Sequence, residues 1–178
     1  WKRNRAATAG QDAVKECSTL FLPDDGERDL RPEARDRYAR YLLRATWFPC
    51  AGYTKQGLLG MVFRKPPEVE LPSELEYLLE NADGGGLSLT QVAKIATEET
   101  IEVGRVGILA EYPPAESGLS AEEVARRNLR ARLTIYKAEA IDNWKYEMVD
   151  GRLMLTMVKL YEIEEIEKDE FLSTVDVR

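Results

Sequence analysis

The sequence predicts an α+β fold, in which several short helices pack on an antiparallel sheet that contains a long β-hairpin. The dipeptide Asp150-Gly151 lies between two apolar-rich runs, and Asp-Gly favours a type I′ turn because that turn needs positive φ at both central residues. Before about residue 61, apolar residues recur at helical spacing. Capping boxes begin at Ser88 and Ser120, which is typical of helix N-termini. Together these patterns predict helices followed by a β-ribbon.

We expect the first part of the chain, residues 1–61, to be helical. The spacing of apolar residues predicts one helix from Asn4 to Phe21. A second helix is expected from Pro32 to Thr46, with Asp29 as its cap, and a third from Cys50 to Met61. Gly57 and Gly60 lie inside the third helix. They indicate either close packing against a neighbouring backbone or a weak helix, because glycine costs about 1 kcal/mol in a helix interior.

The middle part, residues 62–132, has mixed patterns. Val62–Pro72 should be extended and form either an edge segment or a crossing loop, because Pro66 and Pro67 cannot donate ladder hydrogen bonds. In order, the remaining expected elements are a short helix from Ser73, a loop at Asn81–Gly86, a helix from Ser88 to a cap at Gly104, a mostly buried strand at Arg105–Tyr112, and a helix from Ser120.

The last part, residues 133–178, is expected to be a β-ribbon. If Asp150 and Gly151 form the loop, the facing pairs are Val149–Arg152, Met148–Leu153, Tyr146–Leu155 and Trp144–Met157. Alternation then places an apolar set on one side of the ribbon: Trp144, Tyr146, Met148, Leu153, Leu155 and Met157. We expect the ribbon to pack on the core through this side.

Composition limits the function classes. The chain has 178 residues, a net charge of −7 and no histidine, which excludes His-based acid–base chemistry, Ser-His-Asp triads and His metal sites. The acidic balance argues against a protein that coats nucleic acid through bulk charge. Cys17 and Cys50 allow one disulfide, although buried free thiols are the simpler expectation. No apolar run approaches the ~20 residues of a membrane span.

Three groups of polar residues are candidates for function. Arginines cluster after Ser120, and among them the candidates for nucleic-acid or subunit contact are Arg126, Arg130 and Arg132; local pairing with Glu122 and Glu123 is the alternative. Carboxylates that would serve acid–base or metal chemistry are Glu98, Glu99 and Glu102, although a like-charge pair such as Glu98 and Glu102 at i,i+4 usually indicates a solvated helix face. The loop Asp83–Gly86 would suit either a phosphate or a plain flexible turn.

An ordered set of stretches covers nearly the whole chain. They are Gly10–Lys15 with Leu20–Pro23, Tyr38–Ala45, Thr54–Pro67, Leu87–Leu89, Gly104–Leu109 with Tyr112-Pro113, and Tyr136–Trp144. Together they resemble the phage portal-like family, a group of tailed-phage head proteins, and the run Tyr38–Ala45 followed by Thr54–Pro67 is the most characteristic part. The chain departs from the family pattern at Glu111, where we expect an aspartate, and at Thr46–Ala51.

The resemblance implies a structural, non-catalytic subunit of a portal ring, usually of twelve subunits, through which double-stranded DNA is packaged and ejected. It implies the amino-terminal wing part of a longer protein, no cofactor, and partners that include a terminase, scaffold and head-tail adaptor proteins. The implied location is the portal vertex of the virion, after assembly in a bacterial cytoplasm. Two alternatives stay open: a phage or prophage adaptor that forms no ring, and an enzyme with a carboxylate metal site.

Overall fold

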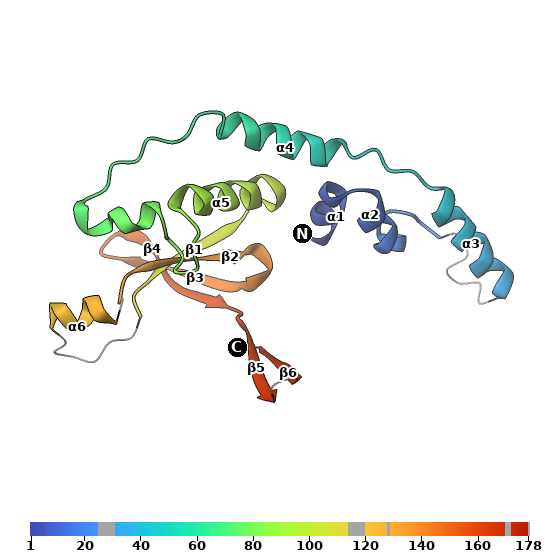
Figure 1. Cartoon of the computed structure of the whole chain (residues 1–178). Helices are drawn as coiled ribbons and strands as arrows, with labels where there is room; N and C mark the ends of the chain where they lie inside the picture. Colours follow the sequence, from blue (N-terminus) through green and yellow to red (C-terminus); the bar gives the residue numbers. More distant parts are fainter. Residues whose placement is uncertain (25–30, 114–119, 128, 170–171, 178) are drawn as a thin grey trace. The chain divides into compact units, whose positions relative to one another are not determined.

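The computed structural model describes residues 1–24, 31–113, 120–127, 129–169 and 172–177 (Figure 1). The chain divides into two compact units, Trp1–Pro67 with Thr100–Gly104, and Glu68–Glu99 with Arg105–Arg178. Helices dominate the first unit, and helices and hairpins share the second. The predicted α+β class with a long β-hairpin is confirmed. That the whole chain is one module of a longer protein stays a prediction.

The first unit is helical. Its elements are α1 (Lys2–Ala9), α2 (Gln11–Glu16), η1 (Ser18–Leu20), α3 (Pro32–Arg44), α4 (Cys50–Val62) and the last residues of α5. The prediction of one continuous helix from Asn4 to Phe21 is wrong. Gly10 has φ +111°, which lies outside the right-handed helical region and is readily adopted only by glycine. The apolar spacing continues across this break, so periodicity alone did not reveal it.

The helices α3 and α4 agree with the predicted ranges to within two residues. Asp29, the expected cap of α3, lies outside the described residues. The interpretation that Gly57 and Gly60 allow close packing is wrong, because a Cβ built at either position meets no described atom within 4 Å. The close approach is instead at Gly52, where a Cβ would lie 2.6 Å from the carbonyl oxygen of Thr8. Only glycine therefore allows α4 to pack this closely on α1.

The second unit combines short helices with paired strands. Its elements are η2 (Ser73–Leu79), α5 (Leu89–Val103), β1 (Val106–Glu111), α6 (Ala121–Arg126), β2 (Arg132–Lys137), η3 (Ala138–Ala140), β3 (Ile141–Val149), β4 (Arg152–Leu160), β5 (Ile163–Asp169) and β6 (Leu172–Val177). The described strands form three separate two-stranded antiparallel pairs, β1–β2, β3–β4 and β5–β6.

Both predicted capping boxes are confirmed. The Ser88 amide donates to the Gln91 side-chain oxygen at 2.8 Å, and the Gln91 amide donates to the Ser88 hydroxyl oxygen at 3.2 Å. Ser120 and Glu123 exchange the same two bonds at 3.1 and 3.3 Å. Gly104 follows α5 with φ +77°, which is the left-handed conformation expected of a helix C-cap.

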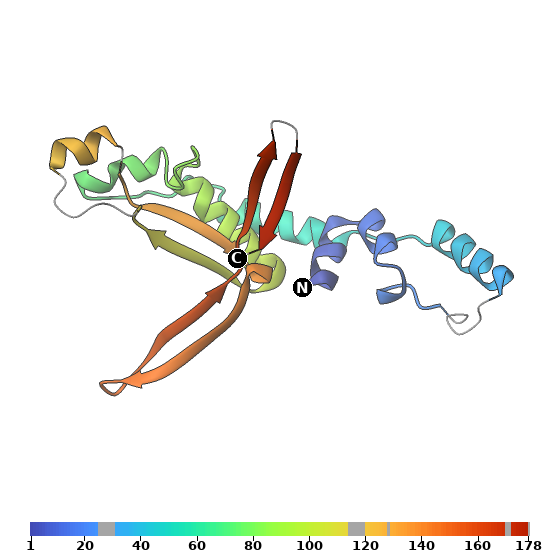
Figure 2. The same ribbon diagram turned by 90° about the horizontal axis from the view of Figure 1, so that it is seen from below.

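The core of the second unit lies where α5 runs along one face of the β1–β2 pair (Figures 1 and 2). Val92 and Ala96 from α5 are buried, as are Tyr136 from β2 and Ala138 after it. The expectation that β1 is mostly buried is wrong, because its central residues are exposed. Among the described strands, β1 has a neighbour on one edge only, so it lacks the flanking strands that enclose a central strand.

Candidate interaction surface

The β3–β4 hairpin has the predicted turn. φ is +50° at Asp150 and +74° at Gly151, as a type I′ turn requires. The structure confirms the predicted pairs nearest the turn, Val149–Arg152, Met148–Leu153 and Tyr146–Leu155. The local geometry of the Asp-Gly loop therefore sets the register over the first half of the ribbon, which Figure 2 shows as a long two-stranded arm.

The predicted pair Trp144–Met157 is wrong, because Trp144 lies opposite Val158. The register shifts between Lys145 and Tyr146, which leaves Thr156 without a facing partner on β3. This is a β-bulge, in which one strand carries one extra residue. The hydroxyl of Thr156 donates to the carbonyl oxygen of Lys145 at 3.3 Å. The bulge residue thus bonds across the ribbon through its side chain.

Beyond the bulge, side-chain alternation on β4 resumes one residue later. Val158 therefore takes the place predicted for Met157 on the apolar side. We call this side the hairpin face: Trp144, Tyr146, Met148, Leu153, Leu155 and Val158. Each of its side chains is 43–67% exposed. The expectation that the ribbon packs on the core through this side is wrong for the described chain.

An apolar groove of about 470 Å³ continues from the hairpin face towards the β1–β2 pair. Its lining residues outside the hairpin face include Val106, Ile108, Tyr136, Ile141 and Leu160. The groove and the hairpin face form one continuous apolar surface, because Trp144, Tyr146, Leu155 and Val158 belong to both.

Arg105 fixes the base of the hairpin. Its Nη2 atom donates to the carbonyl oxygens of Ala138 and Ile141, both at 2.8 Å. Its guanidinium carbon lies 4.8 Å from the ring centre of Trp144, a cation–π distance. One side chain therefore ties the start of β3 to the groove and orients the first aromatic residue of the hairpin face. No pattern in the sequence indicates this role of Arg105.

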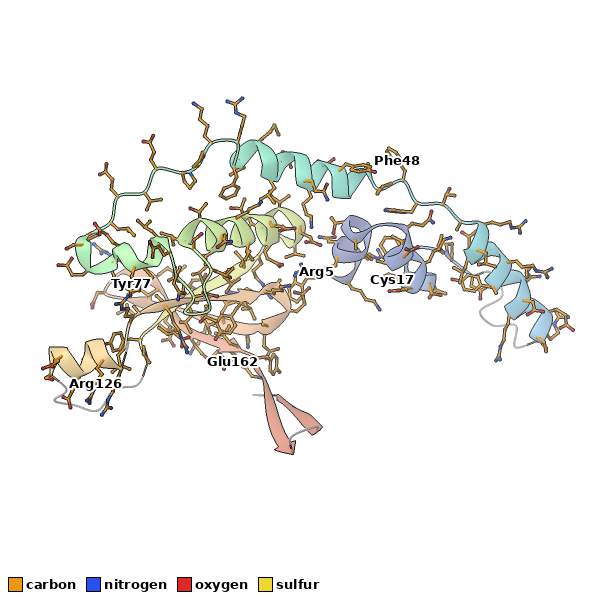
Figure 3. The ribbon with its side chains drawn as sticks, viewed as in Figure 1. Arg5, Cys17, Phe48, Tyr77, Arg126 and Glu162 are labelled. Atoms are coloured by element: carbon orange, nitrogen blue, oxygen red, sulfur yellow. The ribbon has the colours of Figure 1, made fainter. Side chains whose placement is uncertain are left out.

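A phenol–carboxylate contact lies beside the groove. The hydroxyl of Tyr136 donates to Oε1 of Glu162, which follows β4 (Figure 3). This hydrogen bond stabilises the protonated phenol, and burial and the nearby negative charges act in the same direction. The pKa of Tyr136 is raised to about 12. The end of the hairpin is thus joined to β2 by a strong polar contact.

Two of the three predicted arginines line one polar pocket. We call it the arginine pocket, of about 290 Å³; its residues include Tyr77, Glu80, Asn81, Gly84, Arg130 and Arg132. Arg126 is on α6 and does not line it (Figure 3). The predicted cluster therefore separates into a pair that shares a pocket and a third arginine at the surface of a helix.

Two of the three candidate carboxylates of α5, Glu99 and Glu102, are engaged in ion pairs. Glu102 accepts a hydrogen bond from the Thr8 hydroxyl at 2.6 Å and pairs with Lys55 at 3.1 Å and Arg5 at 3.4 Å. Its side chain is only 10% exposed, so a solvated face is the wrong description of this residue. Burial alone would raise the pKa of Glu102, but the hydrogen bonds from Thr8 and Lys55 and the two cations outweigh it and lower the pKa.

Glu99 is buried and lies 3.8 Å from Nζ of Lys137. Within the part of the chain that the structure describes, no group of three or more Cys, Asp or Glu residues is placed to hold a metal ion. Glu102 thus supports packing among helices, and Glu99 contacts a strand.

The loop Asp83–Gly86 binds its own amides. Oδ1 of Asp83 accepts from the amides of Leu87 at 2.9 Å and Gly85 at 2.8 Å, and Asn81 accepts from the Gly86 amide at 3.0 Å. The bond from the Leu87 amide has the largest effect and lowers the pKa of Asp83; burial opposes it, and the bond from Gly85 adds to the lowering. An internal carboxylate therefore occupies the position that a bound phosphate would need, which favours the turn over the phosphate site.

Cys17 and Cys50 are both free thiols, as expected, but the expectation that they are buried is wrong, because Cys17 is half-buried and Cys50 is exposed. None of the helices in the described ranges has the length and apolar character needed to cross a membrane. The sequence matches no protein-family model, and a search of curated proteins found no match.

Proposed function

We propose that this chain is a structural, non-catalytic part of a phage portal subunit, the wing region of a longer protein that assembles into a ring. The observation that carries the proposal is the hairpin face, a row of six large apolar side chains on an exposed two-stranded ribbon. The ordered resemblance to the portal-like family is the reason for proposing a phage portal ring as the assembly. The virion is then its location, and double-stranded DNA passes through the ring.

An isolated two-stranded ribbon is marginally stable in water, and three or more strands or a packed face are usually needed. Fully burying a large apolar side chain contributes about 1.5–3 kcal/mol. Each half-exposed side chain of the hairpin face therefore leaves roughly 1 kcal/mol that a partner surface would supply. Exposed apolar patches of this kind commonly mark protein–protein contacts.

The partner we assign to the hairpin face is a second copy of the same protein. Rings arise when one surface of a subunit contacts a different surface of its neighbour and the rotation closes. An arm that is apolar on one side and mixed on the other suits such a one-sided contact. A net charge of −7 would limit adhesion to the DNA that passes through the ring. Terminase, scaffold and adaptor proteins are the further partners.

The test compares two residues that lie on opposite faces of the ribbon and are equally exposed. Leu155 on the hairpin face and Met154 on the opposite face are both 50% exposed. Leu155→Glu and Met154→Glu are introduced into the complete protein that carries this chain. Electron microscopy and light scattering then report the assembly state, and circular dichroism checks folding.

We expect rings with a central hole for the wild type and Met154→Glu, and loss of rings for a folded Leu155→Glu variant. A wild-type protein that stays monomeric or dimeric over a range of salt and protein concentration would overturn the portal assignment. The adaptor hypothesis would then replace it. Rings that form equally well in both variants would instead show that subunits meet through another surface.

A further inference from the structure

Arg130 is held in place by an aromatic ring. Its guanidinium carbon lies 5.0 Å from the ring centre of Tyr77, and the Tyr77 hydroxyl donates to the carbonyl oxygen of Ala131 at 2.9 Å. The ring is therefore fixed to the residue next to the arginine that it supports. A guanidinium stacked on a ring keeps its N–H groups at its edge, where they remain able to donate.

The charge of Arg130 is not neutralised within the described chain. No carboxylate of the described residues lies within 4 Å of its guanidinium nitrogens. Arg130 nevertheless lines a pocket with a second arginine. The pocket thus contains an ordered, planar donor group whose acceptor is missing from the described residues.

Arg132 is partly engaged. Its Nε atom donates to Oε1 of Glu111 at 2.8 Å, and the same oxygen accepts from the Thr134 hydroxyl at 2.8 Å. The hydrogen bond from Thr134 has the largest effect and lowers the pKa of Glu111, and the bond from Arg132 lowers it further. The terminal nitrogens of Arg132 make no hydrogen bond to the described residues. Arg132 is therefore an oriented second donor, with its Nε already used.

A carboxylate group suits this pair of arginines better than nucleic acid does. A guanidinium fork matches a carboxylate, to which it donates two parallel hydrogen bonds. Glu80 also lines the pocket, and Arg132 already donates to Glu111, so the pocket suits one carboxylate group rather than a row of phosphates. Nucleic acid binding needs many phosphate contacts, and this pocket offers only two arginines among its described lining residues.

We propose that the arginine pocket binds a carboxylate side chain from an acidic segment of another protein chain. Arg130 donates the paired hydrogen bonds, Tyr77 keeps its guanidinium in place, and Arg132 adds the second positive charge. This inference does not depend on ring formation, because the pocket and the hairpin face share no lining residue.

The test uses the full chain and a labelled tetraglutamate peptide with blocked ends, with binding followed by fluorescence anisotropy at low salt. Arg130→Ala removes the stacked donor. Arg130→Lys keeps the charge but not the planar fork. Arg126→Ala removes the same charge from outside the pocket and is the matched control. Circular dichroism verifies that every variant is folded, and a short double-stranded oligonucleotide is titrated in parallel.

We expect saturable peptide binding that is about 10-fold weaker in Arg130→Ala, equal to about 1.4 kcal/mol, and roughly 3-fold weaker in Arg130→Lys. Arg126→Ala should change the affinity by less than about 2-fold. Equal losses in Arg126→Ala and Arg130→Ala would overturn the proposal, because they would indicate general charge attraction. Absence of saturable binding, or oligonucleotide binding that depends on Arg130, would overturn it as well.

Discussion

Glu102 in the first unit and Trp144 in the second occupy environments opposite to those that their side chains favour. Glu102 is charged, yet its side chain is 10% exposed and surrounded by two cations and a hydroxyl. Trp144 is aromatic, yet it is 44% exposed on a ribbon whose neighbours are exposed too. The charged residue has all of its partners within this chain. The apolar row lacks a covering surface in the described chain, which is why we assign its partner to a second copy.

The largest effect should follow from breaking the Glu102 cluster. Glu102→Ala leaves Arg5 and Lys55 beside each other without the carboxylate, and breaking a sheltered ion pair typically costs about 3 kcal/mol. Urea denaturation should show this loss in the free energy of unfolding of the first unit. Glu16→Ala, at an exposed site on α2, should change it by less than about 0.5 kcal/mol. Similar losses in both variants would mean that the cluster contributes nothing special.

The same cluster should respond to acid. The pKa of Glu102 is lowered on folding, so the native state favours the carboxylate. Its contribution is complete above the unfolded-state pKa, near 4.5, and is lost as the pH falls through the lower folded-state value. The wild type should therefore lose stability below about pH 4.5 more steeply than Glu102→Gln. Parallel stability curves for the two proteins would contradict the pKa shift.

A smaller effect is expected where the groove meets the end of the hairpin. Tyr136→Phe removes the hydroxyl that donates to Glu162 and should cost about 1.5 kcal/mol, typical of a hydrogen bond to a charged group. The raised pKa of Tyr136, about 12, means that this contribution is complete below the unfolded value of 10.0. It is then lost as the pH rises through about 12.

The measurement for Tyr136 is a phenolate absorbance titration. One of the eight tyrosines should ionise about two pH units after the reference value in the wild type, and that late step should be absent in Tyr136→Phe. A late step that persists in the variant would assign it to another tyrosine. Tyr53→Phe, at an exposed residue of α4, provides the control.

The smallest effect compares two glycines. Gly151→Ala forces a Cβ into φ +74° and should destabilise the hairpin by about 1 kcal/mol. Gly57→Ala, inside α4 with open space around its Cβ, should stabilise the first unit by roughly 0.5–1 kcal/mol. Thermal unfolding of both variants tests the pair. A stabilising Gly151→Ala would contradict the type I′ turn.

The parts of the fold that depend on neighbouring residues were predictable. The Asp150-Gly151 turn depends on two adjacent residues, and the Ser88 and Ser120 capping boxes depend on residues three positions apart. The bulge was not predictable, because Met157 and Val158 are both apolar and either one satisfies the pattern. The break between α1 and α2 lies at Gly10, a residue type that favours such a break. It was not predicted, because apolar residues recur at helical spacing on both sides of it.

The sites that depend on distant residues were only partly predictable. Glu102 was identified as a candidate, but its partner Thr8 lies 94 residues away and Lys55 lies 47 residues away, so no local pattern links them. Likewise, the arginine cluster was noted from its composition. Its division into the pocket residues Arg130 and Arg132, with Arg126 outside, depends on the ring of Tyr77, which comes from η2. Tertiary contacts of this kind leave no periodic signal.

Because Thr156 is unpaired, the residues of β4 that face the groove have odd numbers before it and even numbers after it. Even-numbered residues beyond it, Val158 and Leu160, share the groove with odd-numbered Leu155 before it. Deletion of Thr156 would remove the bulge but keep Met157 opposite Lys145 and Val158 opposite Trp144, so Val158 and Leu160 would stay on the groove side. Regular pairing of Thr156 with Lys145 would instead carry Met157 and Lys159 to the groove side and place an ammonium group in an apolar contact surface. The bulge therefore decides which side chains of β4 a partner meets, with no change in the turn or in any amino acid.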